Sequence, residues 1–374
     1  MKNYILLLLA VSGSFYAEAQ NTYREITLPQ LMKKYQQDAS SIVIVDVRSD
    51  GEYYDSASRF KSGNIGRIKG VQHVDVSDIG KPESLKMLEP YKDKEVYLIC
   101  SHSYRSRNAS NVLTRNGFKN VNNVQGGMTE WYRRYDELLP YRSSLETSVR
   151  YKNISSAQLY DMMKKKTPFI FIGIDIIPRT FFDSANLRYI PYYPTFKNAQ
   201  FFYESDSAKI LELAKKNPGK PVVLFNNFSN GAAEMADYLA GEGIQNVQYL
   251  VGGITYFMEY GVNNRLMNET AAALTSKNTV RFVTAEFACG NINRKEGGAV
   301  MIDLRADTLF DKMNRGIKTD YKHIKGSVNF PFSKGAAEFE KTYPDKKRPY
   351  LFISRNGNEG IELADQLSKN GYQV

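Results

Sequence analysis

Cysteine and histidine are scarce in this sequence. Its 374 residues include two cysteines, Cys100 and Cys289, and three histidines, His73, His102 and His323. Two cysteines make no disulfide framework for a chain of this length, and because they fall in different predicted domains no bridge between them is expected. The histidines are scattered along the chain without the spacing of metal ligands. The sequence therefore predicts neither a metal site nor a cofactor.

Long hydrophobic runs are missing after the first residues. Lys2 precedes the apolar run 5–11, and Ala17-Glu18-Ala19 offers the small residues of a cleavage site. This pattern predicts a signal peptide over residues 1–19 and an exported mature chain, periplasmic or secreted, that starts near Gln20. The apolar run is too short to span a bilayer, so no membrane span is expected after cleavage. A retained N-terminal anchor is the alternative.

Acidic residues are outnumbered by basic ones, but no block of basic residues is present. The formal net charge is +10, with lysine and arginine spread along the chain. The favoured interpretation is a solvated basic surface, and the weaker one is a field that attracts small anions. Because no nucleic-acid motif accompanies the charge, no such partner is predicted. Hydrophobic residues make up 42% of the chain, which is enough for ordinary packed cores.

One pattern occurs three times along the chain. A strand-like apolar run is followed by a polar loop and a helix-like run, and in the first two copies a second strand-like run ends at Gly-Gly. When the copies are aligned on their shared glycines and asparagines, Asn226 and Ser354 fall opposite Cys100. The three copies cover residues 97–127, 223–253 and 351–372.

The fold class predicted from this pattern is α/β. A further continuous apolar, β-branched run precedes each of these three segments, at 42–48, 169–175 and 299–305, and fits a strand buried on both faces of a parallel sheet. Helical periodicity alternates with these runs, at 28–37, 157–164 and 361–369. We therefore expect tandem domains, each a parallel central sheet with helices on both faces. The expected domains span 23–140, 146–268 and 278–374. The third is incomplete at Val374, because the final strand, the Gly-Gly and the closing helix are missing; either the chain is a fragment or this domain is truncated.

Cys100 stands where α/β sheets place ligands. It ends a predicted strand, a short polar loop follows, and a helix is expected to begin between Ser106 and Ala109. The helix dipole, the unpaired N–H groups of the first turn and the charge of Arg105 would all favour a thiolate, which is the nucleophilic form. The alternative is a small buried residue that only packs at a strand end.

The first copy resembles the rhodanese (sulfurtransferase) domain. The residues that carry this resemblance run from about Tyr23 to Tyr135. They are Cys100 with Arg105-Ser106, Asp46-Val47-Arg48, Ile68-Lys69-Gly70, and Gly126-Gly127-Met128 with Trp131. The third copy is similar through the segments 302–305 and 323–331, and the second mainly through Gly252-Gly253.

The resemblance implies a persulfide relay. Cys100 would take sulfane sulfur from a small anion such as thiosulfate and pass it to a thiol or another thiophilic acceptor. The loop that would hold the sulfur comprises Ser101, His102, Ser103, Tyr104, Arg105 and Ser106, and Asp46 and Arg48 would support it from below. Ser103 departs from the family pattern, which prefers glycine there, and this puts the close approach of the loop backbone in doubt. His102 is interpreted as a solvated loop residue, with proton donation as the alternative.

The other two copies lack this chemistry. Asn226 cannot carry a persulfide, and in the third copy Ser354 and Glu359 replace the cysteine and the arginine. The predicted function is a sulfurtransferase with one active and two degenerate domains. The alternative is a binding or scaffold protein in which Cys100 is vestigial. Phosphatase or arsenate-reductase chemistry is a third possibility, but those relatives have a loop one residue longer than the four residues between Cys100 and Arg105.

Overall fold

The computed structural model describes residues 23–174, 195–226, 230–275, 283, 288, 298–310, 323–354 and 358–374. The predicted signal peptide and Cys289 lie outside this part of the chain. Among the described helices, none is long and apolar enough to cross a membrane.

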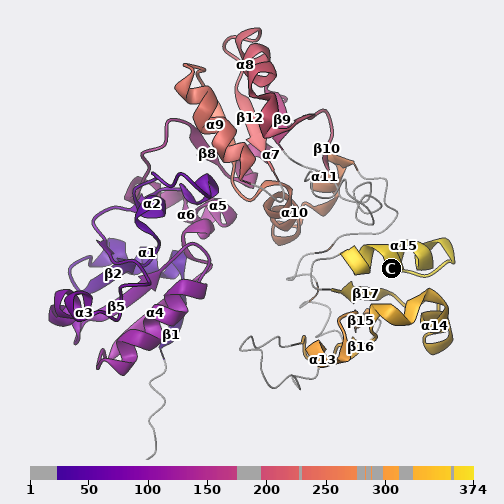
Figure 1. Ribbon diagram of the computed structural model, residues 1–374, viewed down its shortest axis with the longest axis horizontal. Coiled ribbons are helices and arrows are strands. Elements are labelled where there is room, and N and C mark those ends of the chain that lie inside the picture. The colour runs from indigo at the N-terminus through magenta and orange to yellow at the C-terminus, as the bar shows by residue number, and fades with distance from the viewer. Residues whose placement is uncertain are drawn as a thin grey trace, which may run out of the picture. The chain divides into compact units, whose positions relative to one another are not determined.

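The chain divides into two compact units, and Figure 1 labels their helices and strands. The first contains residues 23–49 and 70–127, and the second contains residues 50–69 and the described residues from Met128 onward. The domain boundaries expected from the sequence stay predictions.

The first unit is built on a five-stranded parallel sheet. The strand order is β1-β6-β5-β2-β4, with β1 at Arg24–Thr27, β6 at Asn120–Gln125, β5 at Glu95–Ile99, β2 at Ile42–Asp46 and β4 at Gln72–His73. Every residue of β2 and four of the five in β5 are buried. Since successive side chains of a strand point to opposite faces, both faces of this sheet are covered, as the continuous apolar runs predicted.

Three helices longer than one turn accompany this sheet: α1 (Leu28–Gln37), α3 (Pro82–Leu88) and α4 (Tyr104–Arg115). The bounds of α1 match the sequence prediction, and Thr27 and Gln30 form a capping box at its start. The prediction for the start of α4 was wrong by two to five residues, because the helix begins at Tyr104 rather than at residues 106–109. Ser103 adopts a left-handed conformation with φ 86°, which turns the chain sharply enough for the helix to start at the next residue.

Helix α4 lies against the strands that carry the candidate site. It contacts β5 and β6, and its Ala109 and Leu113 share one hydrophobic cluster with Val96, Leu98 and Cys100. Alternation along β5 puts these last three side chains on the same face of the sheet. The periodicity of the strand therefore points Cys100 toward the beginning of the helix.

The second unit includes the segment 50–69, which lies between the two parts of the first unit in sequence, and the described residues that follow Gly127. Its first elements include α2 (Asp50–Tyr53), the 3-10 turn η1 (Lys61–Gly63), β3 (Arg67–Ile68), α5 (Glu130–Arg133), α6 (Tyr135–Leu138) and β7 (Leu145–Glu146). Strand β3 pairs with β7 in an antiparallel manner.

The main sheet of the second unit is also parallel. Its order is β11-β9-β12-β13-β8, with β11 at Gln200–Phe202, β9 at Ile170–Ile174, β12 at Val222–Phe225, β13 at Val247–Leu250 and β8 at Lys152–Ile154. Its helices are α7 (Ser156–Lys164), α8 (Ser207–Lys215), α9 (Gly231–Gly241), α10 (Gly253–Asn263) and α11 (Met267–Ala272). A small antiparallel pair joins β10 (Thr195–Phe196) to β14 (Leu274–Thr275).

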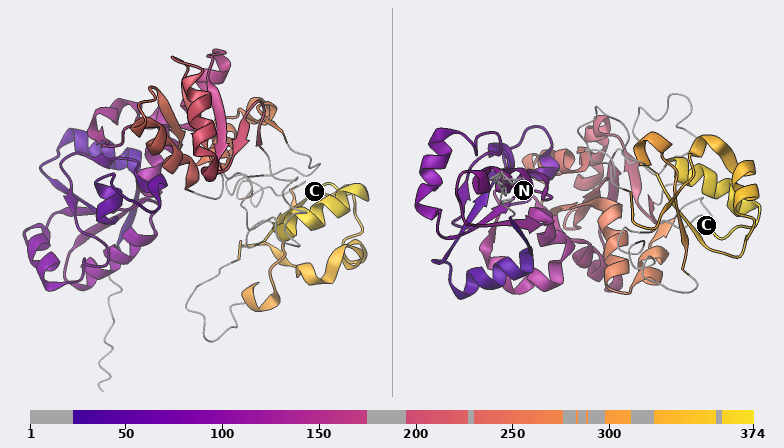
Figure 2. Two further views of the ribbon diagram at one scale, coloured as in Figure 1. Left: turned by 45° about the horizontal axis from the view of Figure 1, so that its top comes forward. Right: turned by 90° about the horizontal axis from the view of Figure 1, so that it is seen from below.

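A three-stranded parallel sheet follows toward the end of the chain. Its order is β16-β15-β17, with β16 at Val328–Asn329, β15 at Val300–Asp303 and β17 at Tyr350–Ile353. It is accompanied by α13 (Asp307–Phe310), α14 (Gly335–Thr342) and α15 (Asn358–Lys369). The three sheets, each with its own helices, can be traced by colour in Figure 2.

The three sheets share one chain path. The five strands of the second sheet have the same order in space and in sequence as those of the first: β8, β13, β12, β9 and β11 correspond to β1, β6, β5, β2 and β4. The third sheet matches the middle of this order, since β17, β15 and β16 correspond to β5, β2 and β4. The alignment of Cys100, Asn226 and Ser354 made from the sequence therefore agrees with the topology, because each of these residues directly follows the equivalent strand.

Candidate active site

The candidate site lies at the carboxyl end of the two central strands of the first sheet. Asp46 is paired in register with Ile99, and the N–H of Val47 donates to the Ile99 carbonyl at 2.8 Å. The residue after Ile99 is Cys100. The turn that follows β2 is thus hydrogen-bonded directly to the strand end from which the cysteine emerges.

Asp46 and Arg48 form a fully buried ion pair at this turn. The Arg48 Nε lies 3.1 and 3.0 Å from the two carboxylate oxygens, and Nη2 lies 2.8 Å from Oδ2. The backbone N–H of Arg48 donates to the same carboxylate, and His73 Nε2 lies 2.9 Å from the Arg48 carbonyl. Such a pair fixes one geometry for the turn, since leaving either charge buried alone would cost several kcal/mol.

The sulfur of Cys100 accepts hydrogen bonds from the loop and from the start of the helix. Its side chain is 1% exposed. The backbone N–H of Ser103 donates to Sγ at 3.1 Å, and the Ser106 hydroxyl lies 3.4 Å from it. Sγ therefore lies at the N-terminus of α4, where N–H groups and the helix dipole favour negative charge. This environment suits a thiolate nucleophile.

Ser103, which replaces the expected glycine, holds the loop through its backbone conformation and its hydroxyl. It holds the left-handed conformation that glycine normally supplies, and its buried hydroxyl compensates for the strain. Its Oγ donates to the Val124 carbonyl at 3.1 Å and accepts from the Gly126 N–H at 2.6 Å. The serine thereby ties the loop to the end of β6. Its own N–H still approaches Sγ to 3.1 Å, although it has a side chain where glycine was expected.

Gly127, the second glycine of the pair after β6, lies too close to the backbone of the Cys100 loop to carry a side chain. A Cβ on Gly127 would lie 2.1 Å from the Cys100 carbonyl oxygen and 2.7 Å from the carbonyl carbon of Ser101, and its φ is +62°. Since real Cβ contacts are never so short, another residue there would displace the loop that follows Cys100.

All but one of the remaining loop residues are at or near the surface. Arg105 Nη2 donates to the Ser101 hydroxyl at 2.9 Å, so the guanidinium bridges from the first turn of α4 back to the start of the loop. His102 is exposed, as predicted, and Tyr104 is 75% exposed. Ser106 is fully buried beside the sulfur.

Two residues at this site were missed by sequence reasoning. Asn123, in β6, is fully buried, and its Oδ1 lies 2.6 Å from the Ser106 hydroxyl. Its Nδ2 donates to Glu25 Oε2 at 2.6 Å. The sequence did carry a signal for Asn123, because it is a polar residue inside a strand that was expected to be buried. A buried amide needs hydrogen-bond partners, and these could have been sought at the neighbouring loop.

The equivalent positions of the other sheets keep the scaffold but not the thiol. Asn226 follows β12 and is buried. After β15, Arg305 Nε lies 2.9 Å from Asp303 Oδ1, and Leu304 N–H donates to the Ile353 carbonyl at 2.7 Å. These contacts reproduce those of Asp46, Val47 and Arg48, and Ser354 then occupies the place of the cysteine. Within the described residues no group of three potential ligands could hold a metal ion.

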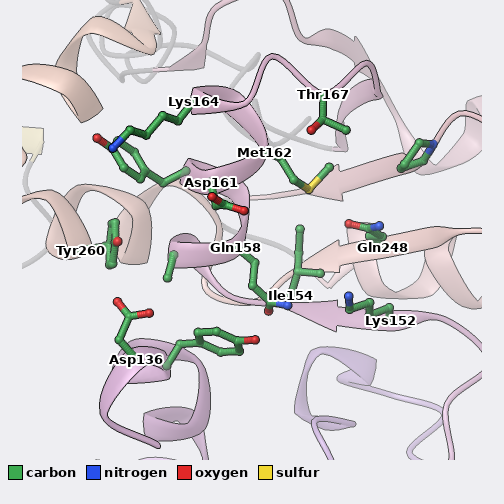
Figure 3. Close-up of a pocket in the computed structure, with 14 residues that line it drawn as sticks. Asp136, Lys152, Ile154, Gln158, Asp161, Met162, Lys164, Thr167, Gln248 and Tyr260 are labelled. Carbon is green, nitrogen blue, oxygen red and sulfur yellow. The ribbon is translucent and has the colours of Figure 1, made fainter. Parts of the chain in front are cut away.

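A separate polar cavity of about 640 Å³ lies in the second unit (Figure 3). It is lined by residues of α6, α7, β8, β13 and α10, and no residue of the Cys100 loop contributes to it. Its polar lining mixes both signs of charge: Asp136, Lys152, Gln158, Asp161, Lys164, Thr167, Gln248 and Tyr260.

The comparison with family models matches residues 28–134 to the rhodanese-like domain. A protein of Bacillus subtilis (strain 168), YtwF, whose name assigns it provisionally to the sulfurtransferases, is 35% identical over 108 residues, which are 29% of this chain and 89% of that protein. The chain belongs to the rhodanese-like domain family. The match places Cys100, its loop, and the Asp46–Arg48 pair inside the rhodanese-like domain.

More distant relatives of the rhodanese-like domain carry different names. The thiosulfate sulfurtransferase GlpE of Pseudoalteromonas translucida is 24% identical over 31% of this chain and 94% of its own length. A tRNA uridine(34) hydroxylase of Cronobacter sakazakii is 28% identical over 28% of each chain. Among solved structures, a rhodanese-related protein from Thermoplasma volcanium is 24% identical over 30% of this chain and 93% of its own, with a TM-score of 0.23.

Proposed function

We propose that this protein is a sulfurtransferase that carries sulfane sulfur on Cys100. The observation that carries the proposal is the position of Sγ at the N-terminus of α4, where the Ser103 N–H donates to it at 3.1 Å. Relatives named as sulfurtransferases, one of them for thiosulfate, support the same chemistry. We expect a small sulfur-containing anion as donor and a thiol or other thiophilic acceptor as the second substrate.

The reaction proceeds in two displacements. The Cys100 thiolate attacks the sulfane sulfur of thiosulfate, a new S–S bond forms, and sulfite leaves with the electron pair of the bond that breaks. The charge that began on Sγ is then carried by the outer sulfur of the persulfide. An acceptor thiolate attacks that outer sulfur, the Cys100 thiolate is released, and no redox cofactor is required.

The loop and its supports have separate roles in this proposal. Ser103 N–H, Ser106 and the dipole of α4 stabilise negative charge at the sulfur. Arg105 holds the loop through Ser101 and adds positive charge for the donor anion. Asp46 and Arg48 support the strand end beneath the loop without touching the sulfur.

The test is mass spectrometry of the Cys100 peptide after incubation with thiosulfate. We expect one added sulfur on Cys100 in the wild type and none in Cys100→Ser, which keeps the shape of the side chain but removes the polarizable thiolate. Arg105→Ala should lower the rate of sulfur transfer by about tenfold to a thousandfold, as for the loss of one electrostatic donor. Circular dichroism checks the fold of each variant.

Three outcomes would contradict the proposal. A wild type that forms no persulfide with any sulfane donor, or a Cys100→Ser variant with full activity, would favour a binding or scaffold role. Turnover of an aryl phosphate that depends on Cys100 would favour phosphatase chemistry over a loop sized for one sulfur.

We further propose that the second and third sheets are divergent copies of the same domain, without sulfur-transfer activity of their own. Their shared strand order supports the common origin, and Asn226 and Ser354 support the loss of chemistry. The second copy retains a structural role, because α9 and β8 hold the segment 50–69. Asp237 lies 2.5 Å from Lys61, Asn230 contacts Ser62, and Asn153 Nδ2 donates to the Asn64 carbonyl at 2.8 Å.

Export of the protein, with removal of residues 1–19, also stays a proposal. It is supported by the charge, apolar run and small residues at the start of the sequence.

A further inference from the structure

The Ser106 hydroxyl has one hydrogen and three acceptors within reach. Its Oγ lies 2.6 Å from Asn123 Oδ1, 3.1 Å from the Ser103 carbonyl and 3.4 Å from Cys100 Sγ. All four residues are buried, so water does not offer a further partner. Which acceptor receives the hydrogen must therefore depend on the charge of the sulfur.

The orientation of the Asn123 amide follows from its other partner. Glu25 Oε2 lies 2.6 Å from Nδ2, and a carboxylate can only accept. Glu25 is in turn paired with Arg107, whose Nε lies 3.2 Å from Oε1. The amide nitrogen must face Glu25, and the amide oxygen must face Ser106. Asn123 is thus held as an acceptor, in competition with the sulfur for the same hydrogen.

We infer that Asn123 is a positioning residue that favours the sulfur-loaded state of Cys100 over the free thiolate; the inference rests on the proposed function. When Sγ is a thiolate, it is the stronger acceptor and draws the Ser106 hydrogen, which leaves Asn123 Oδ1 without it. When sulfur is loaded, the negative charge moves to the outer sulfur and Sγ becomes neutral. The hydrogen then returns to Asn123, whose Oδ1 at 2.6 Å is closer to the Ser106 oxygen than the Ser103 carbonyl at 3.1 Å. The Ser106–Asn123 hydrogen bond therefore exists in the loaded state and is lost in the free thiolate.

The consequence is a shift in the loading equilibrium. A net hydrogen bond between neutral groups corresponds to a factor of about two to ten in an equilibrium constant. Asn123→Leu, which keeps the side-chain volume and removes the acceptor, should lower the equilibrium ratio of persulfide to free Cys100 by about that factor. A purely structural role for Asn123 would change stability but would not move this ratio.

The experiment equilibrates the full chain with defined mixtures of thiosulfate and sulfite and reads the persulfide fraction on the Cys100 peptide by mass spectrometry. The same buffer and the same pH are used for every variant. Asn122→Leu is the matched control, since Asn122 is a neighbouring buried amide of β6 whose Nδ2 donates to the Val96 carbonyl at 3.4 Å. Its ratio should equal that of the wild type.

The Ser106→Ala background provides the decisive comparison. Ser106→Ala has no hydroxyl hydrogen that could move between Cys100 and Asn123. Adding Asn123→Leu should therefore leave the loading ratio of Ser106→Ala unchanged. Glu25→Ala tests the same inference at the exposed partner of the Asn123 amide. This variant replaces Asn123→Leu in the experiment if Asn123→Leu does not fold. It frees the amide to rotate and should lower the ratio, whereas Glu25→Gln, which can still accept, should restore it.

The results separate two kinds of failure. A wild type that does not load at any thiosulfate-to-sulfite ratio overturns the proposed function itself. If the wild type loads but Asn123→Leu matches it, if Asn122→Leu shifts the ratio equally, or if the shift persists in Ser106→Ala, only the role of Asn123 is overturned.

Discussion

Ser103 offers a quantitative test of how the loop is held. Two changes separate the contributions of its backbone and its hydroxyl: Ser103→Ala and Ser103→Gly. The left-handed conformation, with φ 86°, costs a residue with a Cβ about 1–2 kcal/mol. Glycine does not pay this cost, although its flexibility in the unfolded chain removes about 0.5–1 kcal/mol of the advantage.

The hydroxyl contributes in the opposite direction. It donates to the Val124 carbonyl and accepts from the Gly126 N–H, and each such bond contributes about 0.5–1.5 kcal/mol. Ser103→Ala keeps the strain and loses both bonds, so the free energy of unfolding of the first unit should fall by about 1–3 kcal/mol. Ser103→Gly loses the same bonds but relieves the strain, so its loss should be smaller by about 0.5–1 kcal/mol.

Hydrogen–deuterium exchange of the slowest amides in β5 and β6 measures these differences within the first unit. Ser110→Ala is the control, because the hydroxyl of Ser110 donates only within α4, to the Ser106 carbonyl at 2.8 Å, and alanine is a better helix former. It should change stability by less than about 0.5 kcal/mol. A Ser103→Gly protein as stable as the wild type would refute the role of the hydroxyl, and one less stable than Ser103→Ala would refute the argument from backbone strain.

Two further predictions concern the rest of the chain. Burial raises the pKa of Asp237, but hydrogen bonds from Lys61 and Arg150 lower it by more, so the net pKa lies below its ordinary value. A group with a lowered folded pKa stabilises the protein above its unfolded pKa and loses that effect as pH falls. Asp237→Asn should therefore lower the urea midpoint near pH 7, and the difference from the wild type should shrink as the pH falls below about 3.9, the ordinary pKa of an aspartate. A difference that does not change with pH would contradict the ion-pair account. N-terminal sequencing of protein from the periplasm or medium should find Gln20 first, and a retained Met1 on cytoplasmic protein would exclude export.

The Cys100 loop shows how far sequence patterns reach at the site. Local order is enough to predict a strand that ends at Cys100, a polar loop and a helix, because apolar alternation and the helical period are visible in consecutive residues. The start of α4 was misplaced because the position of Ser103 in left-handed space depends on Val124 and Gly126, which are distant in sequence. A serine carries no local signal for that conformation, as a glycine would.

The chain's sequence by itself determined the α/β class and placed Cys100 at the loop between a strand and a helix, and it also led to the alignment of Cys100 with Asn226 and Ser354, which stays a prediction. Each of these rests on a period or a motif that neighbouring residues carry. Only the tertiary structure decided that Asp46 and Arg48 bond at the end of β2 beside Ile99, that Gly127 must lack a Cβ because the Cys100 carbonyl lies against it, and that Glu25 and Asn123 belong to the site. Apart from the Asp46–Arg48 bond, whose partners are close in sequence, these contacts join strands far apart in the chain. Their partners are set by the order of strands in the sheet, which no short-range pattern encodes.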